Sequence, residues 1–315
     1  MFRLIFIIYI FANLLLAGLT EANVQVLGAA KQVSGSCYYF KTDEINFLID
    51  YGLYYPETKT ITYEMDVKNI NELNTQPSVS PKSISAIIIT HAHLDHIGKI
   101  PLLISKGFDG IIYSTEITKE LSIIMFELLL KSTSLGIEKF AKSSNSTKVH
   151  SQNNCKWKNK IKYPKYLSAE RNELYDRNLQ LCKECLSIEI NKIAPLFSTT
   201  PFNQKINISK NVSFEFFEAK HIPGSSSVLI DFDFQNSDKS VFITGDIGSG
   251  LNNILIGKPE KPDEVDYIFI ESTYGGKSRD YQANPFDDFY TDLNNSVKSN
   301  KLVWVPCFVM DRTQK

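Results

Sequence analysis

The sequence has almost no net charge, few histidines and no internal repeat. Its 34 lysines and arginines are almost balanced by 35 aspartates and glutamates, which gives a formal net charge of −1 over 315 residues. A basic field over the whole chain, which would favour nucleic acid or a membrane surface, is therefore excluded, and any polyanion must bind to a local patch. With 43% hydrophobic residues, the composition is typical of a globular protein with a sizeable core.

Only the first residues contain a long apolar run. One early positive charge, Arg3, precedes the apolar residues 4–17, and the small residues Thr20 and Ala22 follow at suitable cleavage positions. This layout is typical of a secretory signal peptide, so we expect residues 1–22 to be removed and the protein to be exported to a periplasm or secreted, without stable membrane association. The alternative is an uncleaved anchor, since the run approaches spanning length.

Cysteine is scarce and odd in number: Cys37, Cys155, Cys182, Cys185 and Cys307. An odd count in an exported protein leaves at least one free thiol or an intermolecular bond. Cys182 and Cys185 form a C-x-x-C pair, with Cys155 and His150 upstream. A zinc site there is one interpretation, although its His-x4-Cys spacing is unusual; a disulfide or unpaired cysteines are the alternatives.

Short apolar strands alternate with helical patterns along most of the chain. The run SAIIIT at residues 85–90 is continuously apolar, as expected of a strand that is covered on both faces. Residues 97–107 and 116–132 then show helical spacing of apolar residues. The alternation predicts a layered α/β domain over residues 23–270, interrupted at residues 132–211 by a polar insertion rich in Lys, Asn and Ser.

The last part of the chain has its own pattern. Asn284 and Pro285 are typical of the N-cap and first turn of a helix, which we expect over residues 285–300. Residues 301–309 form an apolar run that predicts a buried strand, and residues 311–315 look like the first residues of a helix. The sequence stops within that element.

Three of the five histidines lie in one turn, directly after the apolar strand. The stretch THAHLDH contains His91, His93 and His96, with Asp95 between the last two. Imidazole and carboxylate suit Zn²⁺ or a similar divalent ion, and side chains at a strand end are free to converge. Four ligands so close are too many for one tetrahedral ion with an open position. We therefore expect two adjacent ions, with the first two histidines facing one ion and the other two residues facing the second.

Two later residues fit the same pattern. His221 follows the strand FEFFEA and precedes a Gly-Ser turn, and Asp246 follows the strand VFIT and a glycine. Taken singly, each residue is better explained by an ordinary polar loop. Together with the histidine-rich stretch they favour a metal centre.

This constellation resembles the metallo-β-lactamase superfamily, whose signature is His-x-His-x-Asp-His followed by a later His and a later Asp. The stretches ESTYGG at residues 271–276 and Pro-x-Phe-x-x-x-Arg-x-Gln at residues 306–314 narrow the resemblance to the β-CASP branch. That branch contains bacterial ribonucleases and the nuclease of eukaryotic mRNA 3′-end cleavage. The resemblance runs from about Val26 to the last residue, apart from the insertion.

The resemblance implies an αββα sandwich, incomplete here, followed from residue 271 by the start of a truncated β-CASP domain. It assigns Asp50 to the support of the ligand loops, and Arg312 to phosphate contact or to an ordinary surface position. The candidate catalytic residues are Asp95, Asp246 and Glu271. The implied zinc ligands are His91, His93 and His221 at the first ion, Asp95 and His96 at the second, and Asp246 between the two.

The resemblance also implies an activity and a defect in it. Members of the branch hydrolyse RNA phosphodiesters with a metal-bound hydroxide, so RNA is the expected partner. They also carry further histidines downstream, whereas no histidine follows His221 here. We therefore expect one well-occupied zinc site, one weakened site and impaired activity. The alternatives are a hydrolase of β-lactams, lactones or thioesters, and a non-catalytic remnant that binds metal for folding.

Overall fold

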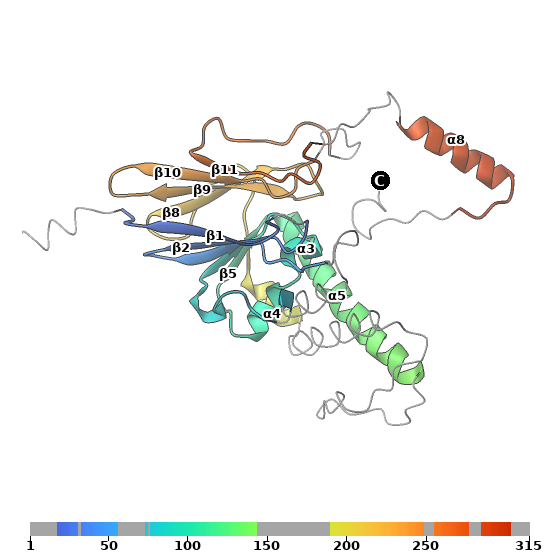
Figure 1. Ribbon diagram of the computed structural model, residues 1–315, viewed down its shortest axis with the longest axis horizontal. Coiled ribbons are helices and arrows are strands. Elements are labelled where there is room, and N and C mark those ends of the chain that lie inside the picture. The colour runs from blue at the N-terminus through green and yellow to red at the C-terminus, as the bar shows by residue number, and fades with distance from the viewer. Residues whose placement is uncertain are drawn as a thin grey trace, which may run out of the picture.

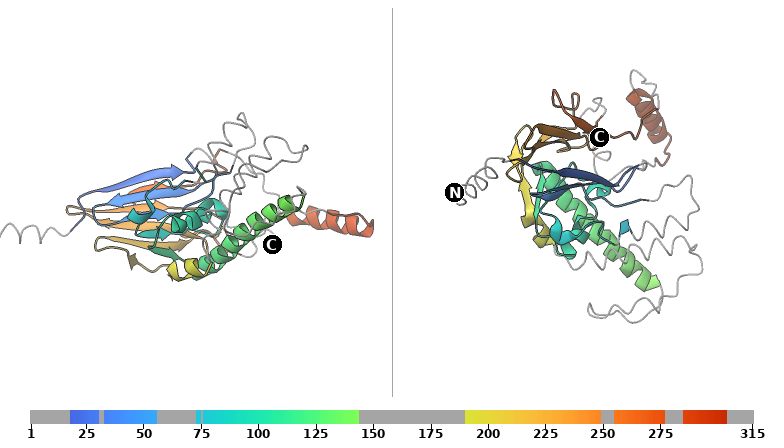
Figure 2. Two further views of the ribbon diagram at one scale, coloured as in Figure 1. Left: turned by 90° about the horizontal axis from the view of Figure 1, so that it is seen from below. Right: turned by 60° about the vertical axis from the view of Figure 1, so that its left-hand side comes forward.

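Two β-sheets face each other in the computed structural model, and helices cover the outer face of one of them (Figure 1). The structure describes residues 18–30, 33–55, 73–74, 76–143, 190–248, 255–276 and 285–303. Figure 2 shows the layers from two further sides. The arrangement is the one expected of a layered α/β domain.

The first sheet has six strands in the order of the chain. They are β1 (Ala22–Gly28), β2 (Cys37–Thr42), β3 (Asn46–Ile49), β4 (Ala86–Ile88), β5 (Ile111–Ser114) and β6 (Phe197–Thr199). The first three strands pair antiparallel, and β3 to β6 pair parallel. The parallel strands point their carboxyl ends to one edge of the sheet, which becomes the edge of the metal centre.

The second sheet has five strands in the order β11-β10-β9-β8-β7. They are β7 (Ile206–Asn207), β8 (Val212–Glu218), β9 (Ser226–Asp233), β10 (Asp238–Ile243) and β11 (Tyr267–Phe269). All neighbours pair antiparallel except β10 and β11, which are parallel. Consequently β8 and β10 run in the same direction and end at the same edge of the sheet.

Two apolar clusters hold the layers together. One lies between the sheets and includes Phe40, Ile88 and Phe214. The other lies between the six-stranded sheet and its helices and includes Ile87 and Phe126. Neighbouring residues of β4 thus enter different clusters, which explains why this strand is apolar throughout.

The helices include α4 (Ile100–Ser105) and α5 (Glu116–Ser143), as the helical spacing predicted. The last described helix, α8 (Pro285–Lys298), confirms the helix expected after Asn284 and lies apart from both sheets (Figures 1 and 2). None of the described helices is both long and apolar enough to cross a membrane.

The expected insertion at residues 132–211 contains more of the fold than its composition suggests. The helix α5 continues to Ser143, and α7 (Ile190–Ile193) and the 3₁₀ turn η3 (Ala194–Leu196) lead into β6. Both β6 and β7 are edge strands within this interval. Strands of two or three residues have too few positions for a readable alternation of apolar and polar residues.

The packed chain also begins earlier than the expected boundary after residue 22. The side chain of Leu19 is only 1% exposed and lies in the cluster between the sheets. Its backbone N–H donates to the carbonyl of Asp233, and Thr20 donates twice to the carboxylate of Asp43. Residues 18–22 therefore belong to the sandwich, a contribution that the signal-peptide pattern conceals.

At the edge opposite the metal centre, one carboxylate joins turns of the two sheets. Glu44, between β2 and β3, accepts hydrogen bonds from the hydroxyl of Ser209, at 2.7 Å, and from the backbone and side-chain amides of Asn211. These contacts tie the β2–β3 turn to the β7–β8 turn.

Several expectations fall outside the described residues. They are the cysteine cluster with His150, Cys155, Cys182 and Cys185, the residue Arg312, and most of the strand at 301–309. Within the described part of the chain, Cys37 is a buried free thiol.

Candidate metal centre

The candidate ligands come from both sheets and meet at the edge where their strands end. They are His91 and His93 after β4, Asp95 and His96 in α3 (Leu94–Ile97), His221 after β8 and Asp246 after β10. Because β4, β8 and β10 all end at this edge, ligands more than 150 residues apart in sequence converge.

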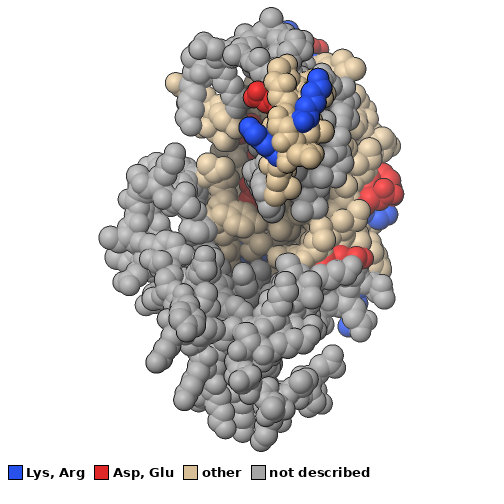
Figure 3. Space-filling model, turned by 90° about the vertical axis from the view of Figure 1, so that its right-hand side faces the viewer, with Lys and Arg blue, Asp and Glu red and all other residues tan. Residues whose placement is uncertain are grey.

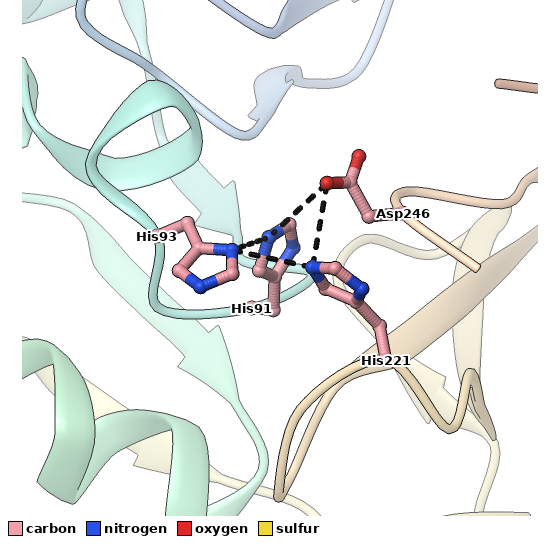
Figure 4. A group of neighbouring side chains, drawn as sticks. All are labelled: His91, His93, His221 and Asp246. Atoms are coloured by element: carbon pink, nitrogen blue, oxygen red, sulfur yellow. Dashed lines mark hydrogen bonds and ion pairs between the residues drawn. The ribbon is translucent and has the colours of Figure 1, made fainter. Parts of the chain in front are cut away.

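Four side chains form a compact first set (Figure 4). The Nδ1 atom of His93 lies 3.0 Å from Nε2 of His91 and 3.2 Å from Nε2 of His221. The Oδ2 atom of Asp246 lies 3.8 Å from Nε2 of His91 and 3.5 Å from Nε2 of His221. All four ligand atoms lie within 4.8 Å of one another.

This first set fits a divalent ion. Bonds of about 2.0–2.1 Å in tetrahedral geometry separate neighbouring ligand atoms by about 3.3 Å. The four distances of 3.0, 3.2, 3.5 and 3.8 Å scatter around that value. Three imidazoles and a carboxylate are also the donors that zinc and similar ions accept in proteins.

A second set shares the same aspartate. The Nε2 atom of His96 lies 3.3 Å from Oδ1 of Asp246 and 4.0 Å from Oδ2 of Asp95. Asp246 therefore presents one oxygen to each set, which is the position between the two sets that the family resemblance implies. The second set has three donors, and its spacing is wider.

Asp50 supports the second set directly. It follows β3, is fully buried, and its Oδ2 lies 2.7 Å from Nδ1 of His96. It also accepts hydrogen bonds from the backbone N–H and the hydroxyl of Thr90 and from the hydroxyl of Ser36. Such support fixes the ring orientation of a ligand histidine.

Three residues in the loops around the ligands have a left-handed backbone conformation. Asp50 has φ 58°, Lys220 has φ 58° directly before His221, and Gly245 has φ 55° directly before Asp246. Outside glycine this conformation is uncommon, and it is often found at functional sites. Asp50 supports a candidate ligand, and Lys220 and Gly245 each directly precede one, whereas the other left-handed residues, Ala29, Asn203 and Asn300, lie elsewhere.

The charges of the site are set by burial and by close neighbours. Burial, reinforced by the neighbouring histidines, lowers the pKa of His91 well below its usual value. Burial also opposes the charged form of His96, but the carboxylates of Asp50 and Asp246 outweigh it and raise the pKa of His96 well above its usual value.

The two carboxylates of the centre shift in opposite directions. Burial raises the pKa of Asp95, and the nearby charge of Asp246 adds to that effect. The pKa of Asp246 is lowered to about 2, because its contacts with His96, His221 and His93 outweigh its burial. Of the two carboxylates, Asp246 is thus the one that favours its charged form.

Glu271 does not join the ligand sets. Its carboxylate accepts hydrogen bonds from the backbone N–H groups of Ile247 and Thr273, both at 3.1 Å. Glu271 therefore ties the end of β11 to the loop that carries Asp246. Its described contacts are those of a residue that positions a ligand loop.

A pair of threonines that the sequence reasoning missed holds the loop of His221. The hydroxyls of Thr115 and Thr118, at the start of α5, both donate to the carbonyl of Gly224 at 2.8 Å. The hydroxyl of Ser225 in turn accepts from the backbone N–H of His221 at 3.0 Å. A threonine at a helix start predicts only a cap, so the sequence gives no signal for this long-range contact.

The sequence of the chain is similar to those of known proteins. The sequence model of the metallo-β-lactamase superfamily matches residues 30–301. A crystal structure of BJP-1, a subclass B3 metallo-β-lactamase of Bradyrhizobium japonicum, is 15% identical, with a TM-score of 0.38 over 86% of this chain and 91% of that chain.

Curated relatives are similar over nearly the whole chain. The RNase J-like protein of Methanocaldococcus jannaschii is 25% identical over 290 residues, which are 91% of this chain and 52% of the relative. The transcription termination factor FttA of Methanosarcina mazei is 24% identical over 93% of this chain and 38% of its own length. The Integrator complex subunit 11 homolog of Dictyostelium discoideum is 25% identical over 93% and 33%. The chain spans about half, or less, of the length of these relatives.

Proposed function

The chain belongs to the metallo-β-lactamase superfamily, and on that premise we propose that it is a zinc-dependent hydrolase that acts on phosphodiester bonds in RNA. The observation that carries the proposal is the convergence of His91, His93, His221 and Asp246 from two sheets, at distances suited to one ion. The RNA substrate is supported by relatives whose names identify them as ribonucleases, and by the ESTYGG stretch of the β-CASP branch.

Each residue has a defined part in this proposal. The first set holds one Zn²⁺, and Asp95, His96 and Asp246 hold a second. Bound ions of this kind lower the pKa of water and neutralise charge on a phosphate. Asp246 keeps the two sets together through its two oxygens, and Asp50 keeps the ring of His96 in place. Glu271 positions the loop of Asp246.

The second ion is expected to bind more weakly than the first. Its set offers three donors, two of them 4.0 Å apart, and burial favours the protonated form of Asp95. Native mass spectrometry during titration with Zn²⁺ should give a one-ion species that saturates before the two-ion species appears. Two ions that load together with equal affinity would contradict the weak second site.

Hydrolysis is tested with labelled RNA and with nitrocefin, a β-lactam. We expect slow, Zn²⁺-dependent cleavage of RNA that EDTA abolishes, and no turnover of nitrocefin. Asp246→Asn should lower kcat/KM by more than about 100-fold. Loss of a residue that only hydrogen-bonds to a metal ligand already lowers activity or metal affinity about 10–100-fold, and Asp246 is itself a proposed ligand. Asp266→Asn, which removes a carboxylate from the surface pair with Lys239, is the matched control.

Two other results would contradict the proposal, and each would favour a different function. Turnover of nitrocefin without cleavage of RNA would assign the chain to β-lactam chemistry. If neither substrate is turned over while chelation unfolds the protein, the metal has a structural role only.

The charge of the chain adds a prediction about salt. The formal net charge is −1, and on the face that Figure 3 shows the described Lys and Arg side chains lie near described Asp and Glu side chains. The affinity for RNA should therefore fall only moderately as the salt concentration rises.

We also propose that the apolar residues 4–17 direct export of the chain. A fusion of the full chain to a reporter should reach the periplasm or the medium, and the same fusion lacking residues 1–17 should remain in the cytosol. The shorter chain keeps Leu19, which lies in the core, so it tests export without removing a packed residue. Equal distribution of both fusions would rule out the export signal.

A further inference from the structure

Thr90 occupies the point where the supports of both ligand sets meet. It lies between β4 and His91 and is fully buried. Its hydroxyl oxygen lies 2.9 Å from Oδ2 of Asp50, 3.1 Å from Nδ1 of His91 and 3.4 Å from Nδ1 of His96. The Thr90 hydroxyl thereby connects the buried carboxylate of Asp50 to the ring of His91.

The chemistry of the three groups fixes the direction of these hydrogen bonds. A carboxylate only accepts hydrogen bonds. The carboxylate of Asp50 accepts one from the backbone N–H of Thr90 and one from Nδ1 of His96. A hydroxyl has a single hydrogen, which Thr90 must therefore give to Asp50. Its oxygen is then left as an acceptor, so the 3.1 Å contact with His91 requires a hydrogen on Nδ1 of the imidazole.

That tautomer leaves the other ring nitrogen free to bind metal. With hydrogen on Nδ1, the Nε2 atom of His91 carries its lone pair toward Nδ1 of His93, 3.0 Å away, and toward Asp246. Asp50 acts in the same way on His96, but directly. We propose that Thr90 is a positioning residue whose hydroxyl links Asp50 to His91 through two hydrogen bonds, which together form a relay. One buried carboxylate then sets the tautomer of a histidine in each ligand set.

The second sheet keeps Thr90 in place for this role. The carbonyl of Thr90 accepts hydrogen bonds from the backbone N–H and the hydroxyl of Ser226, at 2.8 and 3.0 Å. A Cβ placed on Gly245 would approach the Cβ of Thr90 to 2.9 Å, so the threonine side chain is also closely packed from that side. Because Asp50, Thr90 and His91 are each 0% exposed, water does not compete for the hydroxyl.

The wild-type protein gives the first test. Two-bond ¹H–¹⁵N correlation spectra of metal-free protein with ¹⁵N-labelled imidazoles report which nitrogen of a neutral histidine carries hydrogen. We expect His91 to carry hydrogen on Nδ1 at about pH 8, where an ordinary imidazole is neutral. Hydrogen on Nε2 of His91 in the wild-type protein would overturn the proposal.

Two substitutions at Thr90 give the second test. Thr90→Val keeps the volume of the side chain and removes the hydroxyl, so His91 should shift toward hydrogen on Nε2. The affinity for Zn²⁺, measured by competition with a chelator, should fall about 10–100-fold, the usual effect of losing such a partner. Thr90→Ser keeps the hydroxyl and should retain the Nδ1–H signal, with Zn²⁺ affinity within about threefold of wild type.

A matched control separates the relay from the general cost of a lost hydroxyl. Thr42 is also buried, and its hydroxyl bonds to the backbone of Ile45 at the opposite edge of the sheets. Thr42→Val should weaken folding without changing the His91 tautomer or the affinity for Zn²⁺. Wild-type affinity in Thr90→Val, or an equal loss in Thr90→Ser and Thr90→Val, would overturn the role of the hydroxyl.

The relay builds on the proposed metal centre, but the tautomer is measured without metal and without RNA. If RNA is not cleaved and His91 still carries hydrogen on Nδ1, the substrate assignment fails and the relay stands. If Thr90→Val does not fold, the wild-type spectrum and Thr90→Ser still decide.

Discussion

At the scale of single residues, the direction of two ligands, His221 and Asp246, depends on a left-handed residue directly before each of them. Gly245 combines a left-handed φ of 55° with close contact to Thr90, directly before the shared ligand Asp246. A side chain at this position would push the ligand loop away from the strand that carries His91. The glycine thus matters for metal geometry as well as for folding.

Gly245→Ala should therefore lower both the stability and the affinity for Zn²⁺. We expect a loss of about 1–3 kcal/mol in the free energy of unfolding, from the positive φ and the forced contact. Gly276→Ala is the control, because Gly276 has φ 72° but a Cβ there would meet no heavy atom of the described residues within 4 Å. Urea unfolding and chelator competition on both variants measure the two effects. Equal Zn²⁺ affinity in the two variants would show that the contact with Thr90 is harmless.

Lys99 is a buried lysine outside the ligand sets. Its side chain is 1% exposed, its Nζ donates to the carbonyl of Leu73, and it lies 4.7 Å from the ring centroid of Tyr51. Burial lowers the pKa of Lys99 to about 8, below its ordinary value of 10.5. The folded state therefore binds the proton of Lys99 less tightly than the unfolded state does, and protonation of Lys99 destabilises the folded protein.

The sign of the resulting pH dependence follows from proton binding. Above about pH 8 the folded state has released the proton of Lys99 while the unfolded state still binds it, so stability rises with pH toward 10.5. Between about pH 8 and 9.5 we expect the free energy of unfolding to rise by at most about 2 kcal/mol. Lys99→Met should abolish that rise in urea titrations. A wild-type curve that is flat over this range would contradict the lowered pKa.

At the scale of elements, the short segment before β1 contributes to the core. The side chain of Leu19 is buried in the cluster between the sheets, although Leu19 precedes β1. Leu19→Ala should cost about 2–5 kcal/mol, the usual range for a fully buried leucine. Val24→Ala in the neighbouring strand, where the side chain is 39% exposed, should cost much less. Thermal unfolding of both variants tests the difference, and equal losses would place Leu19 outside the core.

The start of α5 controls a ligand loop more than 100 residues away. Thr118→Val removes one of the two hydroxyls on the carbonyl of Gly224, and Thr115 retains the other. We expect a loss of about 1 kcal/mol in stability and a several-fold loss in Zn²⁺ affinity, because the loop of His221 loosens. Thr118→Ser keeps the donor and should restore the affinity. A several-fold loss in the serine variant as well would show that the methyl group matters and the hydroxyl does not.

At the scale of the whole molecule, the metal centre joins the two sheets. His91 and His93 belong to the six-stranded sheet, whereas His221 and Asp246 belong to the five-stranded sheet. A bound ion must therefore stabilise the pair of sheets as a unit. At a concentration 100 times its Kd, Zn²⁺ should stabilise by about 2.7 kcal/mol. Calorimetry should give a higher Tm with Zn²⁺ and a lower one with EDTA, and no shift would indicate that the ligands do not close on the ion.

The sequence predicts the longer elements and the ligands better than the contacts that hold them. Strands such as β8 and β9 have seven or eight residues and a readable pattern, and the metallo-β-lactamase superfamily is confirmed. The strands β6 and β7 lie in a polar interval and were not predicted. Thr90 and Gly224 lack any residue pattern of their own, because their partners lie far away in the chain. Proximity to a ligand in sequence is the only signal that marked Thr90.

Glu44 gives the sandwich a fastening at the edge farthest from the ligands. It needs no ion, since its partners Ser209 and Asn211 are part of the chain. These hydrogen bonds therefore join the two sheets at one edge without a cation, whereas a bound ion would add a connection at the other edge. Removal of the cation should lower the stability at the ligand edge, while the Glu44 contacts and the apolar cluster between the sheets still keep the two layers in register.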